Sequence, residues 1–111
     1  MDLDFFSDFE RVRDLRLKKG QEYATAKALS WQLQKLEGHI LAQKQQFFIS
    51  KGMPVGRAEV EAKASPEYSN HIRGTSAAIE KELRLKAEYE NLDSNFEQLR
   101  SLCSLEKKNR D

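Results

Sequence analysis

Histidine and cysteine, the side chains that most often bind metals or attack substrates, are few in this sequence. His39 and His71 fall in different segments, whereas the common helical zinc site needs two histidines one turn apart with a glutamate. Cys103 is the single cysteine, and no base stands beside it to generate a thiolate nucleophile. We expect the histidines on a solvated helix surface and Cys103 as a small core residue. The sequence therefore predicts no catalytic residue, no metal ligand and no cofactor, and it argues against an enzyme.

Basic side chains offer a different chemistry, the binding of phosphate groups. They gather near the start of the chain, at its end, and around a break in the middle, where the group is Lys44, Lys51, Arg57 and Lys63. Phe47 and Phe48 stand between the two lysines before the break, and cations beside aromatic rings suit phosphate contacts and base stacking. Two interpretations stay open. Either this group binds nucleic acid, or Phe47 and Phe48 are core residues and the lysines are merely solvated.

The elements that position this group are helical. Residues 21–51 carry a seam with heptad-like spacing, formed by Leu29, Leu33, Leu36, Ile40 and Phe47. Trp31 lies off this seam, so it either widens the buried face or contacts another chain. Residues 1–19 are predicted to form a separate short amphipathic helix, acidic at its start and basic at its end, which Gly20 terminates or kinks.

A second long helix is predicted after the break. The connection, residues 52–65, is rich in glycine and proline and contains a short helix-prone stretch, RAEVEAKA. Ser65 is a good N-cap and Pro66 suits the first helical position, so the helix should run from residue 66 to about 107. Because no segment has the alternating pattern of a strand, the predicted fold is all-α. It is a long antiparallel helical hairpin, coiled-coil-like, with a short N-terminal helix and a hairpin domain over residues 20–111.

Apolar surface exceeds what a single hairpin can cover. The aromatic side chains alone, Phe5, Phe6, Phe9, Trp31, Phe47 and Phe48, give more surface than one antiparallel pair needs. We therefore expect a homo-oligomer. Its assembly is assigned to the seam of the last helix, which consists of Leu85, Tyr89, Leu92, Phe96, Leu99 and Leu102. Phe5 and Phe9 are assigned to the docking of a partner.

The composition of the chain limits which partners and which cellular compartment can be expected. Charged residues make up 33% of the chain, yet 19 Lys and Arg face 18 Asp and Glu, so the chain is too neutral to coat nucleic acid by charge alone. The one cysteine fits a reducing compartment. No apolar run approaches the roughly 20 residues that span a bilayer, and the acidic start is unlike a signal peptide. We expect a soluble, cytoplasmic protein with no membrane partner.

Several motifs together resemble the phage recombination-mediator proteins of the UvsY type. The resemblance covers the helix before the break, the break KGMPV, the stretch RAEVEAKASPEYSN and the terminal LRSLCSLEKK, from about residue 21 to 108. It implies an oligomeric accessory protein in the host cytoplasm that binds single-stranded DNA and contacts the single-strand binding protein. It also implies that the protein helps to load the recombinase onto that DNA. The family's basic pair falls on Lys44 and Lys51, but Ala42 and Gln43 stand where a second charge close to Lys44 is expected.

Three hypotheses follow. The leading one is a recombination mediator that grips single-stranded DNA with repeated lysines at the break. The second is a structural or adaptor protein that works through helix–helix contacts and has no nucleic-acid role. The third, a small regulator of a host protein, has no sequence feature that separates it from the second.

Overall fold

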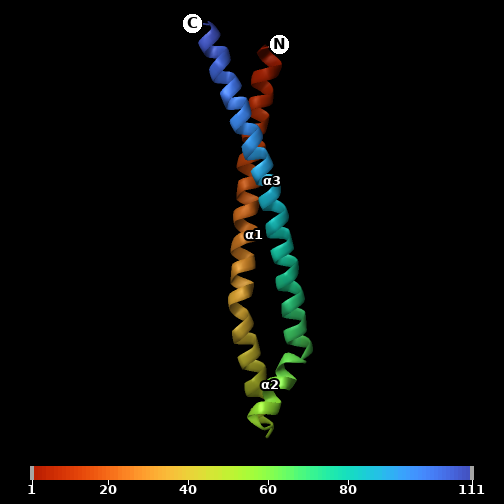
Figure 1. Ribbon diagram of the computed structural model, residues 1–111. Helices are drawn as coiled ribbons and strands as arrows, with labels where there is room; N and C mark the ends of the chain where they lie inside the picture. The colour runs from red at the N-terminus through yellow and green to blue at the C-terminus, as the bar shows by residue number, and fades with distance from the viewer. Residues whose placement is uncertain (1, 111) are drawn as a thin grey trace. The chain divides into compact units, whose positions relative to one another are not determined.

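Three helices make up almost all of the backbone that the structure describes. The computed structural model describes the backbone of residues 2–110 and the side chains of residues 7–109. Helix α1 spans Asp2–Ser50, α2 spans Val55–Lys63 and α3 spans Pro66–Arg110 (Figure 1). No strand occurs between residues 2 and 110. The predicted all-α helical hairpin is confirmed, and the helix-prone stretch in the connection forms α2.

Two compact units divide the chain, and α1 and α3 contribute to both. The terminal unit comprises Met1–Thr25 and Glu82–Asp111, and the bend unit comprises Ala26–Lys81. Within the terminal unit, Phe9 of α1 meets Phe96 of α3, and Tyr23 meets Tyr89. The earlier residue of α1 thus pairs with the later residue of α3, so the two helices are antiparallel in this unit.

The bend unit has the same antiparallel arrangement. The Leu33 carbonyl contacts His71, and the Glu37 carboxylate contacts Tyr68. The turn and α2 belong to this unit and connect the end of α1 to the start of α3.

The predicted boundary at Gly20 does not exist, because α1 continues through it without interruption. A glycine inside a helix costs only about 1 kcal/mol relative to alanine. That cost is small beside the side-chain contacts that α1 makes on both sides of Gly20. The lack of a side chain also has a use there, since a Cβ atom at Gly20 would lie 3.1 Å from the Tyr89 ring. The short N-terminal helix is therefore the first part of α1.

Helix α1 ends in a Schellman motif. In this motif a residue in the left-handed helical conformation follows the helix, and two backbone amides donate hydrogen bonds to carbonyls of the last turn. The Gly52 amide donates to the Ile49 carbonyl at 2.9 Å, and the Met53 amide donates to the Phe48 carbonyl at 3.1 Å. Gly52 has φ of 92°, a conformation that a residue with a Cβ adopts only with strain. These hydrogen bonds fix the backbone positions of Phe48 and Lys51 at the end of the helix.

The start of α3 follows the predicted capping residues. Ser65 is buried, and its hydroxyl accepts a hydrogen bond from the Tyr68 amide at 3.3 Å while donating to the Ala62 carbonyl at 2.6 Å. Pro66 is the first residue of α3 and has no amide that would need a partner. Ser65 thus links the end of α2 to the first turn of α3.

Small side chains fill the interior of the bend unit. Its buried residues are Ala26, Ser30, Ala58, Ala62, Ser65, Thr75 and Ala78. The leucines predicted to form the seam are not among them. A core of this kind buries little apolar area, so larger side chains remain at the margins of the helix pair and are available for contacts outside it.

Candidate nucleic-acid interface

Two lysines and two phenylalanines cluster at the C-terminal end of α1, as the sequence predicted. The Lys44 ammonium lies 4.8 Å from the Phe47 ring centroid and 5.4 Å from that of Phe48. The Lys51 ammonium lies 5.6 Å from the Phe47 centroid. Phe47 is 48% exposed, and its ring meets Phe48 edge-on with centroids 5.5 Å apart. We name Lys44, Phe47, Phe48 and Lys51 the bend cluster.

The bend cluster combines charge with an accessible ring. Lysines three or four residues from an aromatic residue share its helix face, which explains why both ammonium groups approach Phe47. Each cation–π contact of this kind contributes about 0.5–1 kcal/mol at an exposed site. The interpretation in which Phe47 and Phe48 are core residues beside solvated lysines does not hold for Phe47, which is half exposed, whereas Phe48 is half-buried. The other interpretation, binding of nucleic acid, stays a prediction.

Lys44 is also held by α3. Its ammonium is 3.2 Å from a carboxylate oxygen of Glu67, and its side chain is only 21% exposed, against 59% for Glu67. The pKa of Glu67 is lowered, first by a hydrogen bond from its own backbone amide at the start of α3 and then by Lys44. Sequence analysis did not single out Glu67. The only signal was an acidic residue in the first turn of a helix, a position that the helix dipole favours.

The other two predicted cations lie in α2 and are exposed. The Lys63 ammonium is 3.5 Å from the Glu59 carboxylate one helical turn earlier. Arg57 forms no ion pair with any residue whose side chain the structure describes, and the same holds for Lys51. Lys51 and Arg57 are therefore the cations of the predicted group that remain free to meet a phosphate.

The seam of α1 in the bend unit differs from the predicted one. The buried and half-buried positions alternate by four and three through Ala26, Ser30, Leu33, Glu37, Ile40 and Lys44. Leu29 and Leu36 are 48% and 45% exposed and form a stripe beside this seam. These leucines widen the apolar stripe of α1 beyond the positions that face α3.

Trp31 belongs to neither stripe. It is exposed, and the Lys35 ammonium lies 3.6 Å from its ring centroid. The expectation that Trp31 widens the buried face of the hairpin is therefore wrong. A contact with another chain stays a prediction.

His71 is not a solvated surface residue, as the sequence had suggested. It is half-buried, and its Nε2 lies 2.8 Å from the Leu33 carbonyl of α1, a distance at which a protonated Nε2 donates. Nearby, the Tyr68 hydroxyl donates to Glu37 at 2.9 Å, which together with partial burial raises the pKa of Tyr68. These polar contacts connect α1 to α3 and fix their register. His39 is exposed, as expected.

Phe9 and most of the residues assigned to oligomerisation pack inside the terminal unit. Phe9 stacks on Phe96 with centroids 5.3 Å apart, and Leu85 is buried. Tyr89, Leu92 and Leu99 are half-buried. Leu102 is exposed, and Cys103 takes the next half-buried position. The side chain of Phe5 lies outside the described residues.

Because these residues pack within the chain, substitutions at them test folding as well as the binding of a partner. A polar substitution at Phe9 would disturb packing within the chain, so loss of a partner after that substitution would not identify a docking site. The contribution of Leu85 and its neighbours to an oligomer stays a prediction.

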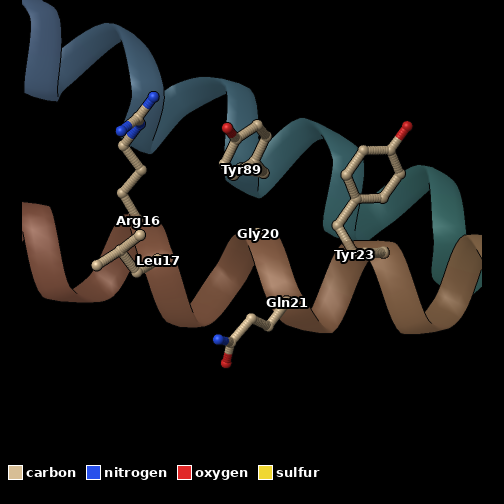
Figure 2. A pocket seen from close by; sticks show the side chains of 7 residues that line it. Arg16, Leu17, Gly20, Gln21, Tyr23 and Tyr89 are labelled. Carbon is tan, nitrogen blue, oxygen red and sulfur yellow. The ribbon is translucent and has the colours of Figure 1, made fainter.

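An open groove of about 410 Å³ follows α1 and α3 in the terminal unit. It is lined by Arg16, Leu17, Gly20, Gln21, Tyr23, Ala24 and Tyr89, and Figure 2 shows Tyr89 of α3 lying over Gly20 of α1. The Arg16 guanidinium at one end donates to Asp93 at 2.7 Å, which raises the pKa of Arg16. Because this cation is already paired across the helices, it holds the unit together rather than offering a free charge.

Lys19 makes a comparable contact in the terminal unit. Its ammonium lies 2.9 Å from Glu88 and 3.2 Å from Glu22, and these carboxylates raise its pKa in that order. Several of the basic side chains near the start of the chain are thus already paired with carboxylates. The bend remains the better candidate for binding phosphate.

Comparison with protein-family models, with curated proteins and with solved structures gave no match. The resemblance to UvsY-type mediators therefore stays a prediction that rests on the quoted motifs. In the described part of the chain, no helix is long and apolar enough to cross a membrane. Residues 7–109 contain no group of three or more His, Cys, Asp or Glu side chains placed to hold a metal ion.

Proposed function

We propose that this protein binds single-stranded nucleic acid at the bend and acts as a non-enzymatic accessory protein. The observation that carries the proposal is the position of Phe47, a half-exposed ring with the Lys44 and Lys51 ammonium groups 4.8 and 5.6 Å from its centroid. An unpaired base can stack on such a ring while lysines contact the phosphates beside it. Bases in a duplex are already stacked, so the cluster favours single strands.

Each chain supplies few charges to this interaction. The net charge is +1, and of the predicted cations only Lys51 and Arg57 lack an ion-pair partner among the described side chains. Affinity would then come from repetition of the bend cluster around an assembly of copies. In its finer form, the proposal is a recombination mediator that helps to load a recombinase onto DNA coated by a single-strand binding protein. This finer form is what the resemblance to UvsY-type proteins implies.

The direct test is a fluorescence-anisotropy titration with a labelled oligothymidylate at several salt concentrations. The negative slope of log K against log salt becomes shallower by about 0.7 for each lysine–phosphate contact that is lost. Lys51→Gln should weaken binding and make the slope shallower by this amount. Lys81→Gln removes the same charge from an exposed position elsewhere in the bend unit and should change neither. If the unmodified protein fails to bind at low salt, the proposal is wrong.

The exposed stripe beside the α1 seam favours a second candidate function, assembly through helix–helix contacts. Leu29 and Leu36 lie two turns apart on one face, and each is nearly half exposed. Another copy of this chain is the proposed occupant, because the bend cluster needs repetition to bind with useful affinity. Leu29→Gln with Leu36→Gln should lower the mass measured by sedimentation equilibrium. Leu17→Gln with Leu83→Gln, at two exposed leucines of the terminal unit, is the matched control. An unchanged mass in the double variant would exclude this stripe as the interface.

A further inference from the structure

Two of the four predicted cations at the bend already have carboxylate partners, and the two pairs differ. Lys63 and Glu59 lie one turn apart in α2, and both side chains are more than half exposed. A pair of this kind opens easily. Lys44 and Glu67 come from different helices, and the Lys44 side chain is only 21% exposed. A phosphate that approaches this ammonium therefore meets the negative charge of the Glu67 carboxylate beside it.

Glu67 contacts the Lys44 ammonium with a carboxylate oxygen, an anionic group like the phosphate oxygen that the bend is proposed to bind. Its carboxylate oxygen is 3.2 Å from the Lys44 ammonium, while the same ammonium lies over the Phe47 and Phe48 rings. Its place as the second residue of α3 also stabilises the negative charge, because backbone amides at a helix start point toward it. The lowered pKa of Glu67 agrees with this position. A persistent anion therefore competes with any phosphate at this lysine.

We propose that Glu67 is a built-in competitor that limits the affinity of the bend for single-stranded nucleic acid by occupying Lys44. The inference rests on the proposed function and adds its regulation. Lys51, with no ion-pair partner among the described side chains, makes the first phosphate contact. Lys44 joins only when a phosphate displaces the Glu67 carboxylate.

The test compares Glu67→Gln with a variant that changes the net charge equally. Glutamine keeps the size of the side chain but loses the charge, so Lys44 becomes available. Glu61→Gln removes one negative charge from α2, in the same unit, at a residue with no ion pair among the described side chains. Both variants and the unmodified protein are titrated with labelled oligothymidylate across a salt series. Circular dichroism at the assay temperature verifies that each remains helical.

We expect Glu67→Gln to bind about two- to fivefold more tightly at low salt, the gain that corresponds to removing an exposed ion pair. Its salt slope should be steeper by about 0.7, which is one additional phosphate contact. Glu61→Gln should give a smaller gain with an unchanged slope. In a Lys44→Gln background, Glu67→Gln should no longer produce the extra gain or the steeper slope.

Three results would overturn the inference. One is a Glu67→Gln variant that binds no more tightly than the unmodified protein, and another is a gain equal to that of Glu61→Gln. The third is a steeper slope that persists when Lys44 is replaced. In each case the unmodified protein still binds, so the proposed function survives. If neither the unmodified protein nor Glu67→Gln binds at low salt, the proposed function fails and the inference fails with it.

Discussion

Replacement of Phe47 separates a binding role from a packing role. A buried phenylalanine replaced by alanine costs about 3–5 kcal/mol, because a cavity remains. Phe47 is 48% exposed, so only about half of the roughly 1.5–3 kcal/mol for complete burial is at stake, and water can fill the space. We expect Phe47→Ala to lower the free energy of unfolding by about 1 kcal/mol.

The same substitution should have a larger effect on binding. Stacking of a base on an aromatic side chain contributes about 1–3 kcal/mol, so loss of the ring should weaken oligothymidylate binding by about fivefold or more. Phe47→Leu is the sharper variant, since it keeps apolar bulk and helix propensity but removes the ring. Phe47→Trp keeps a stacking surface and should bind as the unmodified protein does.

The assays are urea unfolding followed by circular dichroism and fluorescence anisotropy with a labelled oligothymidylate. Two results would refute the reasoning. A loss of 3–5 kcal/mol on Phe47→Ala would mean that the ring is a core element. Unchanged affinity in Phe47→Leu would mean that no base stacks on it.

Further predictions concern stability. Gly74→Ala should raise the free energy of unfolding by about 1 kcal/mol in urea titrations, since nothing lies within 4 Å of the new Cβ. Gly20→Ala should gain less, because its Cβ would lie 3.1 Å from the Tyr89 ring, and a larger gain than at Gly74 would contradict the packing described. The lowered pKa of Glu67 favours its ionised form, so its contribution is complete above the ordinary value of 4.5 and is lost as the pH falls through the lower folded value. Glu67→Gln should therefore lose less stability in acid, and an equal loss would count against the pairing. The raised pKa of Tyr68 favours its neutral form, so its contribution is complete below 10.0 and is lost as the pH rises through the higher folded value. Tyr68→Phe should remove that alkaline loss in unfolding measurements between pH 9 and 11, and a loss of unchanged size would exclude Tyr68 as its source.

Helix ends near the bend could be predicted because their causes are local. Ser65 accepts from an amide three residues away, and Pro66 fits the first helical position whatever surrounds it. Gly52 likewise ends α1 through bonds to the preceding turn. At Gly20 the local signal gave the wrong prediction, because contacts with a distant part of the chain decide the outcome there. Its sequence signal is that of a helix end, but the contacts of α1 with α3 continue past it.

The α1 seam could not be predicted from the leucines, because its register is set by contacts with a distant part of the chain. Ser30 and Glu37 take seam positions, and these polar residues carry no hydrophobic signal. Leu29 and Leu36 carry the strongest signal and lie beside the seam. The Lys44–Glu67 ion pair could not be predicted for the same reason, because its two residues belong to separate helices.

Photocrosslinking tests most directly that the bend is the binding site. An oligothymidylate with bromodeoxyuridine substitutions is irradiated with the unmodified protein, and the crosslinked tryptic peptides are identified by mass spectrometry. The crosslink is expected on the peptide QQFFISK, which contains Phe47 and ends at Lys51. Crosslinks that fall only on peptides of the terminal unit, with QQFFISK unmodified, would contradict the account.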